Sequence, residues 1–194
     1  SINKADSVVL YISAATSYQL QDSVFLLPNA DKFKGNALPH DKVAKCIRAA
    51  TEKGYERLRQ EHIADYQRLF NRVNFSLTDH IPSITTDKLL YQYRNGKQDP
   101  YLEELFFQYG RYLLIASSRP GSLPANLQGA WNQYEYAPWS GGYWHNVNVQ
   151  MNYWPAFNTN LAESFIPYME YNEAFRKAAV QEAIKYITQN NPQA

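Results

Sequence analysis

The segment from residue 99 to residue 116 carries the strongest helix signal in the chain and most constrains the fold. Asp99 can cap the helix N-terminus, Pro100 suits the first helical position, and two glutamates follow in the first turn, where the helix dipole favours negative charge. Apolar residues then recur at spacings of three and four and form one stripe: Leu102, Leu105, Phe106, Tyr109, Tyr112, Leu113 and Ala116. A helix with such a stripe is expected to pack against a large apolar surface.

Other helices are predicted on both sides of this segment. Apolar residues at helical spacing indicate helices over residues 41–51 and 55–70, which Gly54 divides, and a short helix over residues 87–93. The final helical pattern covers residues 168–187. The chain is therefore expected to be mainly α-helical.

The region between Val149 and the last helix has its own start signals. A helical pattern resumes near Val149 after a long loop that begins at Ser122. Asn160, followed three residues later by Glu163, resembles a capping box, and Pro167 is expected to kink or restart the helix that this box opens. Glu163 is thus read as a capping residue in preference to a catalytic acid.

Two short strands are predicted, and neither has a partner within the chain. A β-branched run at residues 8–12 and an alternating segment at residues 72–77 both have strand patterns, whereas residues 18–40 have the composition of a loop or linker. Two lone strands cannot form a sheet with a hydrophobic face, and the helices lack a full set of packing partners. We therefore expect the chain to be a fragment of a larger protein.

Composition excludes several classes of partner. The 19 basic and 18 acidic residues give a net charge of +1, so no basic surface for nucleic acid or membrane is predicted. No segment has the length of a membrane span or the pattern of a signal peptide. Cys46 lies in a helical pattern and the histidines are scattered, so neither a metal site nor a cofactor is expected. A neutral substrate fits this balance.

The segment from Trp131 to Trp154 contains all four tryptophans of the chain and six asparagine or glutamine residues. Sugars have apolar C–H faces that stack on aromatic rings, and hydroxyl groups that need neutral hydrogen-bonding partners. The alternative is a buried aromatic cluster, in which each amide would need a partner. Trp154, at helical spacing from Met151, is itself predicted to belong to the core. The composition of the segment favours a carbohydrate-binding surface.

Two stretches of the chain closely resemble glycoside hydrolase family 95: FFQYGRYLLIASSRPGSLPANLQGAWN, at residues 106–132, and PWSGGYWHNVNVQMNYWPAFNTNLAE, at residues 138–163. The resemblance extends from about residue 55 to residue 163. The family contains inverting α-L-fucosidases and some α-L-galactosidases, often secreted or periplasmic bacterial proteins. In its members a β-sandwich domain is followed by a helical linker and an (α/α)6 toroid that carries the active site.

The resemblance implies a domain organisation for this chain. Residues 1–17 would be the end of the N-terminal β domain. Residues 18–84 would form a linker loop, the linker helices and a strand that returns to the β domain. Residues 85–194 would be the first part of the toroidal catalytic domain. The implied fold is mainly α, with strand remnants of the sandwich before the helices.

The resemblance also implies catalytic roles for Asn146 and Asn148, which match an Asn-X-Asn motif that positions the attacking water. A spacing of two in an extended segment would place both amides on one side. An amide cannot accept a proton at neutral pH, so a carboxylate partner is required. The resemblance implies that this partner is an aspartate, and that both the aspartate and the general-acid glutamate lie beyond Ala194. The chain alone is therefore expected to be inactive without the remainder of its parent enzyme.

Six further residues are predicted to bind substrate: Trp131, Asn132, Trp139, Tyr143, Trp144 and His145. Trp131 and Asn132 match family positions near the pocket, although Trp131 could equally be a packing residue. Trp139 and Tyr143 could line the mouth of the pocket. Where the family has histidine, or threonine in some galactose-preferring members, this chain has Trp144, with His145 one place later. Trp144 would replace a hydrogen bond to the sugar with stacking, whereas His145 could donate to a hydroxyl or make a structural bond.

These observations predict a fragment of a glycoside hydrolase that cleaves terminal α-L-fucosyl or α-L-galactosyl residues from glycans by inversion. One alternative is a non-catalytic carbohydrate-binding protein derived from the family. Another is a helical scaffold whose aromatic residues are only core, but the chain lacks a repeat period and its amide-rich loop is long. Glu135 is the only carboxylate between Trp131 and Trp154.

Overall fold

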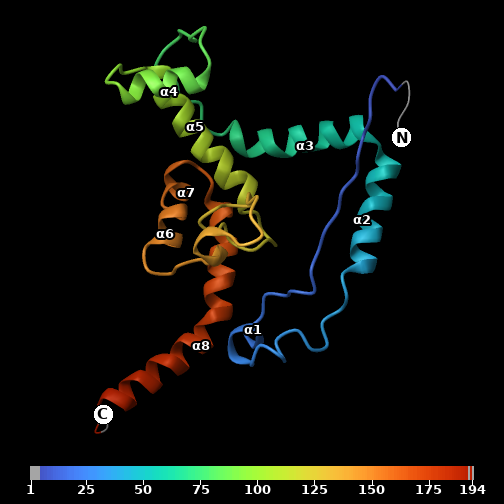
Figure 1. The fold of residues 1–194 in the computed structure, drawn as a ribbon, viewed down its shortest axis with the longest axis vertical. Helices are drawn as coiled ribbons and strands as arrows, with labels where there is room; N and C mark the ends of the chain where they lie inside the picture. Colours follow the sequence, from blue (N-terminus) through green and yellow to red (C-terminus); the bar gives the residue numbers. More distant parts are fainter. Residues whose placement is uncertain (1–4, 192, 194) are drawn as a thin grey trace. The chain divides into compact units, whose positions relative to one another are not determined.

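The computed structural model describes residues 5–191 and 193, and this part of the chain is mainly α-helical (Figure 1). The elements follow one another as α1 (Ser23–Leu26), α2 (His40–Lys53), α3 (Tyr55–Phe70), α4 (Thr86–Arg94), α5 (Pro100–Ser117), η1 (Pro138–Gly141), α6 (Asn148–Tyr153), α7 (Pro155–Asn158), η2 (Ala162–Phe165) and α8 (Ile166–Asn190). The predicted end segments 1–17 and 85–194 include residues 1–4, 192 and 194, which lie outside the described residues.

The four predicted helices between residues 41 and 116 are confirmed as α2 to α5. Gly54 separates α2 from α3 with a φ of +76°, a conformation that favours glycine, and its N–H donates to Ala50 O at 3.1 Å. The predicted cap of α5 is also present, because Asp99 Oδ1 accepts from the N–H of Leu102 at 3.0 Å. Local sequence therefore determines where these helices begin and end.

The two predicted strands do not form within the described residues. The β pairing there consists of one isolated antiparallel bridge between Asn126 and Gly129. Residues 8–12 and 73–76 have no regular structure, and the side chains of Leu10 and Ile12 are 77% and 88% exposed. A strand needs a neighbour to satisfy its backbone groups, and these segments have none here.

The chain divides into two compact units, and α3 and α8 each contribute to both. One unit comprises the described parts of residues 1–65 and 171–194. Within it, the ring of Phe25 in α1 packs edge-on against Tyr171 and Phe175 of α8, with centroid distances of 5.4 and 5.3 Å. Asp22, which precedes α1, forms an ion pair with Lys177 of α8. The other unit comprises residues 66–170 and contains the main core.

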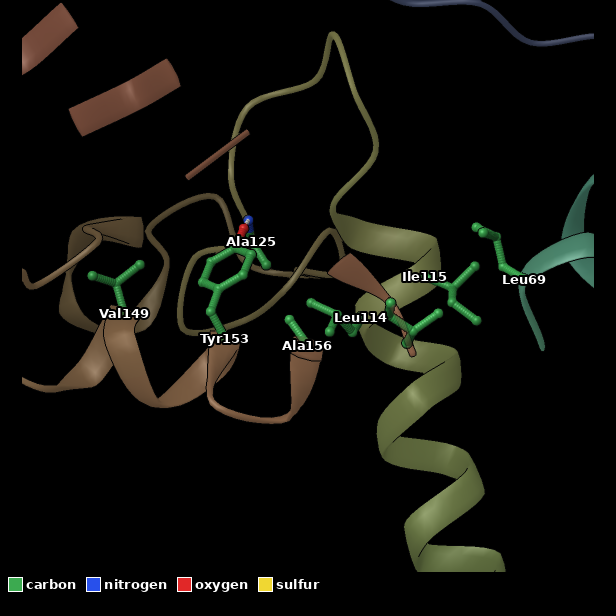
Figure 2. Close-up of a cluster of buried hydrophobic side chains, with 8 residues drawn as sticks. Leu69, Leu114, Ile115, Ala125, Val149, Tyr153 and Ala156 are labelled. Atoms are coloured by element: carbon green, nitrogen blue, oxygen red, sulfur yellow. Dashed lines mark hydrogen bonds between the residues drawn. The ribbon is translucent and has the colours of Figure 1, made fainter. Parts of the chain in front are cut away.

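The core of the second unit lies between α5, the end of α3 and the short helices α6 and α7 (Figure 2). Its buried members are Leu69, Leu114, Ile115, Ala125, Val149, Tyr153, Ala156 and Leu161. The prediction that Trp154 belongs to the core is wrong, because its side chain is 62% exposed and Met151 is 49% exposed. Val149 and Tyr153 occupy the buried face of α6 instead. A tyrosine can be buried where its hydroxyl group has hydrogen-bond partners.

The apolar stripe predicted along α5 is only partly buried. Phe106 and Tyr109 are 81% and 55% exposed, whereas the fully buried face contains Leu102, Leu114, Ile115 and, unexpectedly, Arg111. The Arg111 guanidinium donates to the carbonyl oxygens of Leu69 and Phe70 at 3.2 and 2.9 Å. These carbonyls end α3 and have no partner within that helix. A buried cation that caps another helix cannot be predicted from apolar periodicity.

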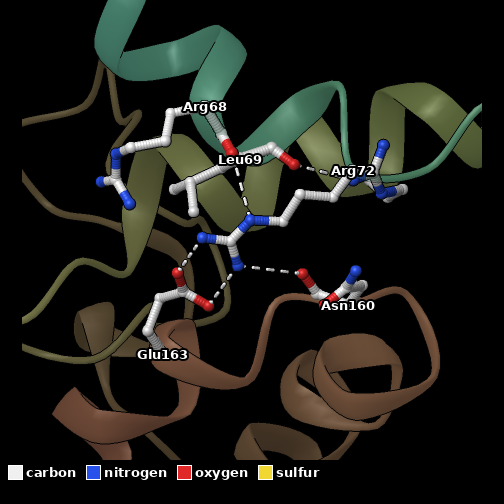
Figure 3. Close-up of polar contacts among 6 residues, drawn as sticks. Arg68, Leu69, Arg72, Asn160 and Glu163 are labelled. Atoms are coloured by element: carbon white, nitrogen blue, oxygen red, sulfur yellow. Dashed lines mark hydrogen bonds and ion pairs between the residues drawn. The ribbon is translucent and has the colours of Figure 1, made fainter.

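A second polar contact links the segment after α3 to η2 (Figure 3). Arg72 binds both carboxylate oxygens of Glu163, at 2.6 and 2.8 Å, and donates to the carbonyl oxygen of Asn160 at 3.4 Å. The predicted capping box is wrong, because Asn160 has a φ of +58° and the residue that precedes η2 is Leu161, without a side-chain cap. The predicted restart at Pro167 is confirmed, since η2 ends at Phe165 and α8 begins at Ile166.

Candidate functional site

The tryptophans of the 131–154 segment are all solvent-exposed. Trp131, Trp139, Trp144 and Trp154 have exposed fractions of 44%, 66%, 52% and 62%. Three of them lie in the irregular connection between α5 and α6, where the amide-rich sequence is found. A buried aromatic cluster therefore does not describe this segment in the described structure, and the tryptophans form part of an accessible surface.

Tyr153 anchors the start of this connection to the core. Its hydroxyl oxygen accepts from the buried N–H of Ala125 at 2.7 Å and lies 2.8 Å from Ser118 Oγ. Ser118 Oγ donates its single proton to the carbonyl oxygen of Ser164 at 2.8 Å, so the Tyr153 hydroxyl must donate to Ser118. Burial raises the pKa of Tyr153, which keeps the hydroxyl protonated for this role.

The neighbouring Asn152 holds the same part of the connection from its other side. The Asn152 amide nitrogen donates to the carbonyl oxygens of Ala125 and Asn126, at 3.3 and 3.1 Å. Two consecutive residues of α6 therefore bind both the N–H and the C=O of Ala125. This pairing satisfies buried backbone groups and fixes the connection against the end of α6.

A cavity of about 250 Å³ lies between α5 and the anchored connection. Its polar lining comes from Ser117, Asn126, Gln128 and Asn152, and Trp131 adds an aromatic side. Gly129 also lines it with a φ of +64°, and a Cβ added there would lie 2.8 Å from the Trp131 ring. Only glycine therefore allows the indole to lie this close to the backbone.

A second cavity of about 560 Å³ adjoins the same indole and is lined by Asn132, Tyr134 and Pro138 as well as Gln128 and Trp131. Asn132 forms a local turn, in which its amide nitrogen donates to Tyr134 O at 2.9 Å and its Oδ1 accepts from Tyr134 N at 3.1 Å. The Gln128 amide nitrogen donates to Pro138 O at 3.1 Å. The structure thus places Trp131 at both cavities and Asn132 at the second one.

Trp139 and Trp144 are joined to each other. The indole Nε1 of Trp144 donates to the carbonyl oxygen of Trp139 at 3.2 Å. Both residues have a φ of +53°, and Ser140 between them has a φ of +56°. Non-glycine residues in this region cost about 1–3 kcal/mol each and concentrate at functional sites. The geometry of this tryptophan pair is therefore held by the surrounding loop.

Tyr143 and His145 lie deeper than the tryptophans. Tyr143 is half-buried and packs against the core, although it was predicted at the mouth of the pocket. The His145 ring stacks on Tyr168 with a centroid distance of 6.3 Å, and its carbonyl oxygen accepts from the Gln150 amide. Burial lowers the pKa of His145, so the imidazole is neutral near pH 7.

Asn146 and Asn148 are not in an extended segment, and that expectation is wrong. The Asn148 N–H donates to Asn146 O at 3.0 Å around Val147, whose φ of 65° and ψ of −39° form a tight turn of the rare γ type. Asn148 is also the first residue of α6. Both asparagines are exposed, and within the described residues their amide groups make no side-chain hydrogen bond. Their side chains are available to a ligand.

Several residues of the two cavities were not singled out from the sequence. Asn126, Gln128 and Asn152 line them, whereas the lining includes neither Asn146 nor Asn148. The available signal was the concentration of amides on both sides of Gly129. Glu135, the carboxylate of the 131–154 segment, is exposed. Within the described residues, no group of three or more His, Cys, Asp or Glu side chains is placed to bind a metal ion. The helices of this part of the chain also lack the combination of length and apolar character that a membrane span needs.

Comparison with known sequences relates this arrangement to a family of enzymes. Residues 54–192 match the glycosyl hydrolase family 95 catalytic domain. The chain is 39% identical to alpha-L-fucosidase 2 of Arabidopsis thaliana over 183 residues, which are 90% of this chain and 20% of the relative. It is 41% identical to probable alpha-fucosidase A of Aspergillus niger over 166 residues, 84% of this chain and 20% of the relative. The counterpart from Aspergillus oryzae is 42% identical over 159 residues, which are 78% of this chain and 22% of the relative. The chain therefore spans about a fifth of the length of the curated relatives it matches.

Proposed function

Since this chain belongs to glycosyl hydrolase family 95, we propose that it is part of an enzyme that removes terminal α-L-fucosyl or α-L-galactosyl residues from glycans. The observation that carries this proposal is the exposed surface of tryptophans and amides around Trp131, which suits a neutral sugar. The relatives described above are named as α-fucosidases. Because of these names, we propose fucose over galactose as the terminal sugar.

We infer an inverting mechanism in which Asn146 and Asn148 position the attacking water. The turn around Val147 presents two exposed amides within three residues, and each amide oxygen can accept a hydrogen bond from one water. Inversion also needs two proton-transferring carboxyl groups about 6.5–9.5 Å apart. Glu163 does not suit this role, because Arg72 binds both of its oxygens and the hydrogen bonds from Arg72 lower the pKa of Glu163. The carboxyl groups would come from the rest of the parent enzyme.

The domain organisation proposed for the parent enzyme follows the same family. Residues 85–194 would form the first part of an (α/α)6 toroid, residues 18–84 the linker, and residues 1–17 the end of a β-sandwich. The exposed side chains of Leu10 and Ile12 support this proposal, since a strand in such a sandwich would bury alternate side chains. The segment alone would be inactive, because it would lack the proton donor.

The test uses the full-length parent enzyme with an aryl α-L-fucoside and the matching α-L-galactoside. We expect release of the aryl group, faster from the fucoside, and proton NMR of the first product should show the β anomer of the free sugar. A first product in the α form would contradict inversion. Binding of L-fucose without hydrolysis would instead support a non-catalytic carbohydrate-binding protein.

A further inference from the structure

The turn that carries the two proposed water-positioning residues is closed by three hydrogen bonds. Three successive carbonyl oxygens accept them, those of Trp144, His145 and Asn146. The N–H groups of Val149 and Asn148 donate to the first and the last of these carbonyls, at 3.2 and 3.0 Å. The middle carbonyl, that of His145, accepts from the side-chain amide nitrogen of Gln150. Two of the three bonds are therefore made by the backbone, and the third depends on one side chain.

The backbone of this turn has a conformation that needs such support. Val147 has a φ of 65° and Trp144 a φ of 53°, both in the left-handed region. Non-glycine residues seldom adopt this conformation, and for a β-branched residue such as valine it is a true outlier. The Val147 side chain is 49% exposed, so its own packing does little to hold it there. The hydrogen bonds across the turn are the contacts that oppose this strain.

Gln150 holds the turn from a fixed position. It lies in α6 directly after Val149, whose side chain is completely buried in the core. The same helix is anchored by the Tyr153 hydroxyl, which accepts from the N–H of Ala125. Gln150 Oε1 is buried and has no hydrogen-bond partner within the described residues, so the side chain is oriented there through its amide nitrogen. The bond to the His145 carbonyl is thus what this glutamine contributes.

The ring of His145 fixes the same residue on its other side. It stacks on Tyr168 of α8 with a centroid distance of 6.3 Å, and Tyr168 stacks in turn on the buried Tyr153 at 5.0 Å. His145 is therefore held by the core at its ring and by α6 at its carbonyl group. Asn146 follows it directly in the chain, so the backbone that carries the first asparagine starts from an ordered residue.

We propose that Gln150 is a positioning residue for hydrolysis. Its amide nitrogen holds the carbonyl group of His145 and so keeps the turn closed. The closed turn keeps the Asn146 and Asn148 side chains directed at one water. The inference rests on the proposed role of these two asparagines and adds the residue on which their geometry depends. A displacement of about 1 Å in a reacting group can cost on the order of 10²-fold in rate, so a bond behind the turn affects the chemical step.

The test begins with single-turnover hydrolysis of an aryl α-L-fucoside by the full-length enzyme. Gln150→Met keeps the length of the side chain but removes its donor. We expect this change to lower the rate about 10–10²-fold, while Kd for L-fucose changes less than about threefold. Gln67→Met is the matched control, because Gln67 is exposed on α3, and it should change the rate less than about twofold.

A double-mutant cycle separates positioning from general damage to the fold. Added to Asn148→Ala, Gln150→Met should cost less than about threefold, because the asparagine pair that the turn positions is already broken. An equal loss in both backgrounds, or no loss in the wild-type background, would overturn the inference. A wild-type rate in Asn148→Ala alone would instead contradict the proposed function.

Hydrogen–deuterium exchange of the full-length enzyme gives a readout that does not need hydrolysis. Peptides that cover residues 144–151 contain the N–H groups of Asn148 and Val149, whose bonds close the turn. Gln150→Met should speed their exchange on the order of tenfold, and Gln67→Met less than about twofold. Unchanged exchange in Gln150→Met would overturn the inference whatever the activity. If Gln150→Met does not fold, Gln150→Asn tests the same points, since its amide is one methylene too short to reach the His145 carbonyl.

Discussion

The hydroxyl group of Tyr153 is predicted to control the order of the connection that carries the candidate site. Tyr153→Phe removes this group and keeps the ring in the core. The N–H of Ala125 then loses its acceptor at 2.7 Å, while Ala125 is only 5% exposed and has little access to water. Ser118 loses a donor at 2.8 Å but keeps its bond to Ser164 O. The main cost is thus one buried, unpaired N–H.

Leaving such a group unpaired costs about 1–3 kcal/mol, and we take about 2 kcal/mol for this one. A local opening free energy reduced by this amount raises the exchange rate of the affected amides roughly 30-fold. Hydrogen–deuterium exchange with mass spectrometry, on peptides of the full-length enzyme that cover residues 123–131, measures this rate directly. We expect faster exchange in these peptides and little change in α4.

Tyr136→Phe is the matched control, because Tyr136 is 88% exposed and no side-chain hydrogen bond of its hydroxyl group is found within the described residues. In Tyr136→Phe, the exchange rate of the peptides that cover residues 123–131 should stay within about twofold of wild type, as expected of a surface substitution. Equal exchange in wild type and Tyr153→Phe would refute the conclusion that the Tyr153 hydroxyl holds the connection.

Two further predictions concern Glu163 and Trp144. Glu163→Gln in the full-length enzyme should lower Tm more than Glu173→Gln, because Glu163 is held in a two-oxygen pair with Arg72 whereas the Glu173–Arg176 pair is exposed. The hydrogen bonds from Arg72 lower the pKa of Glu163. The stability that the pair contributes is therefore present above pH 4.5 and is lost as the pH falls through the lowered pKa. A Tm difference between wild type and Glu163→Gln that did not shrink in acid would contradict this prediction. Trp144→His should raise the affinity for L-fucose roughly fivefold, since the indole N–H is already bound to Trp139 O and an imidazole supplies a new partner; unchanged affinity by calorimetry would count against a sugar contact at this position.

The helices could be predicted because their signals are local. Asp99 and Pro100 start α5, and Gly54 separates α2 from α3, as the sequence indicated. Which face of each helix is buried depends on neighbours that are distant in sequence. Arg111 is buried on α5 because it caps α3, while Phe106 on the same helix is exposed. Apolar periodicity contains no information on such a cap.

An exposed surface in the segment from residue 131 to residue 154 could be predicted from the sequence, but the internal geometry of that segment could not. The concentration of tryptophans and amides indicated an accessible surface, and all four tryptophans are exposed. The turn at Val147 was not predicted, since a β-branched residue rarely adopts a φ of 65°. Gln128 and Asn152 were missed as lining residues because the contacts that place them come from Pro138, Ala125 and Asn126.

Single-turnover hydrolysis by Asn148→Ala full-length enzyme tests whether Asn146 and Asn148 position the attacking water. We expect the rate on an aryl α-L-fucoside to fall about 10²–10⁴-fold, while Kd for L-fucose changes less than about threefold. Asn71→Ala, an exposed asparagine next to α3, should retain the wild-type rate. A wild-type rate in Asn148→Ala would show that the Asn148 side chain does not position the water.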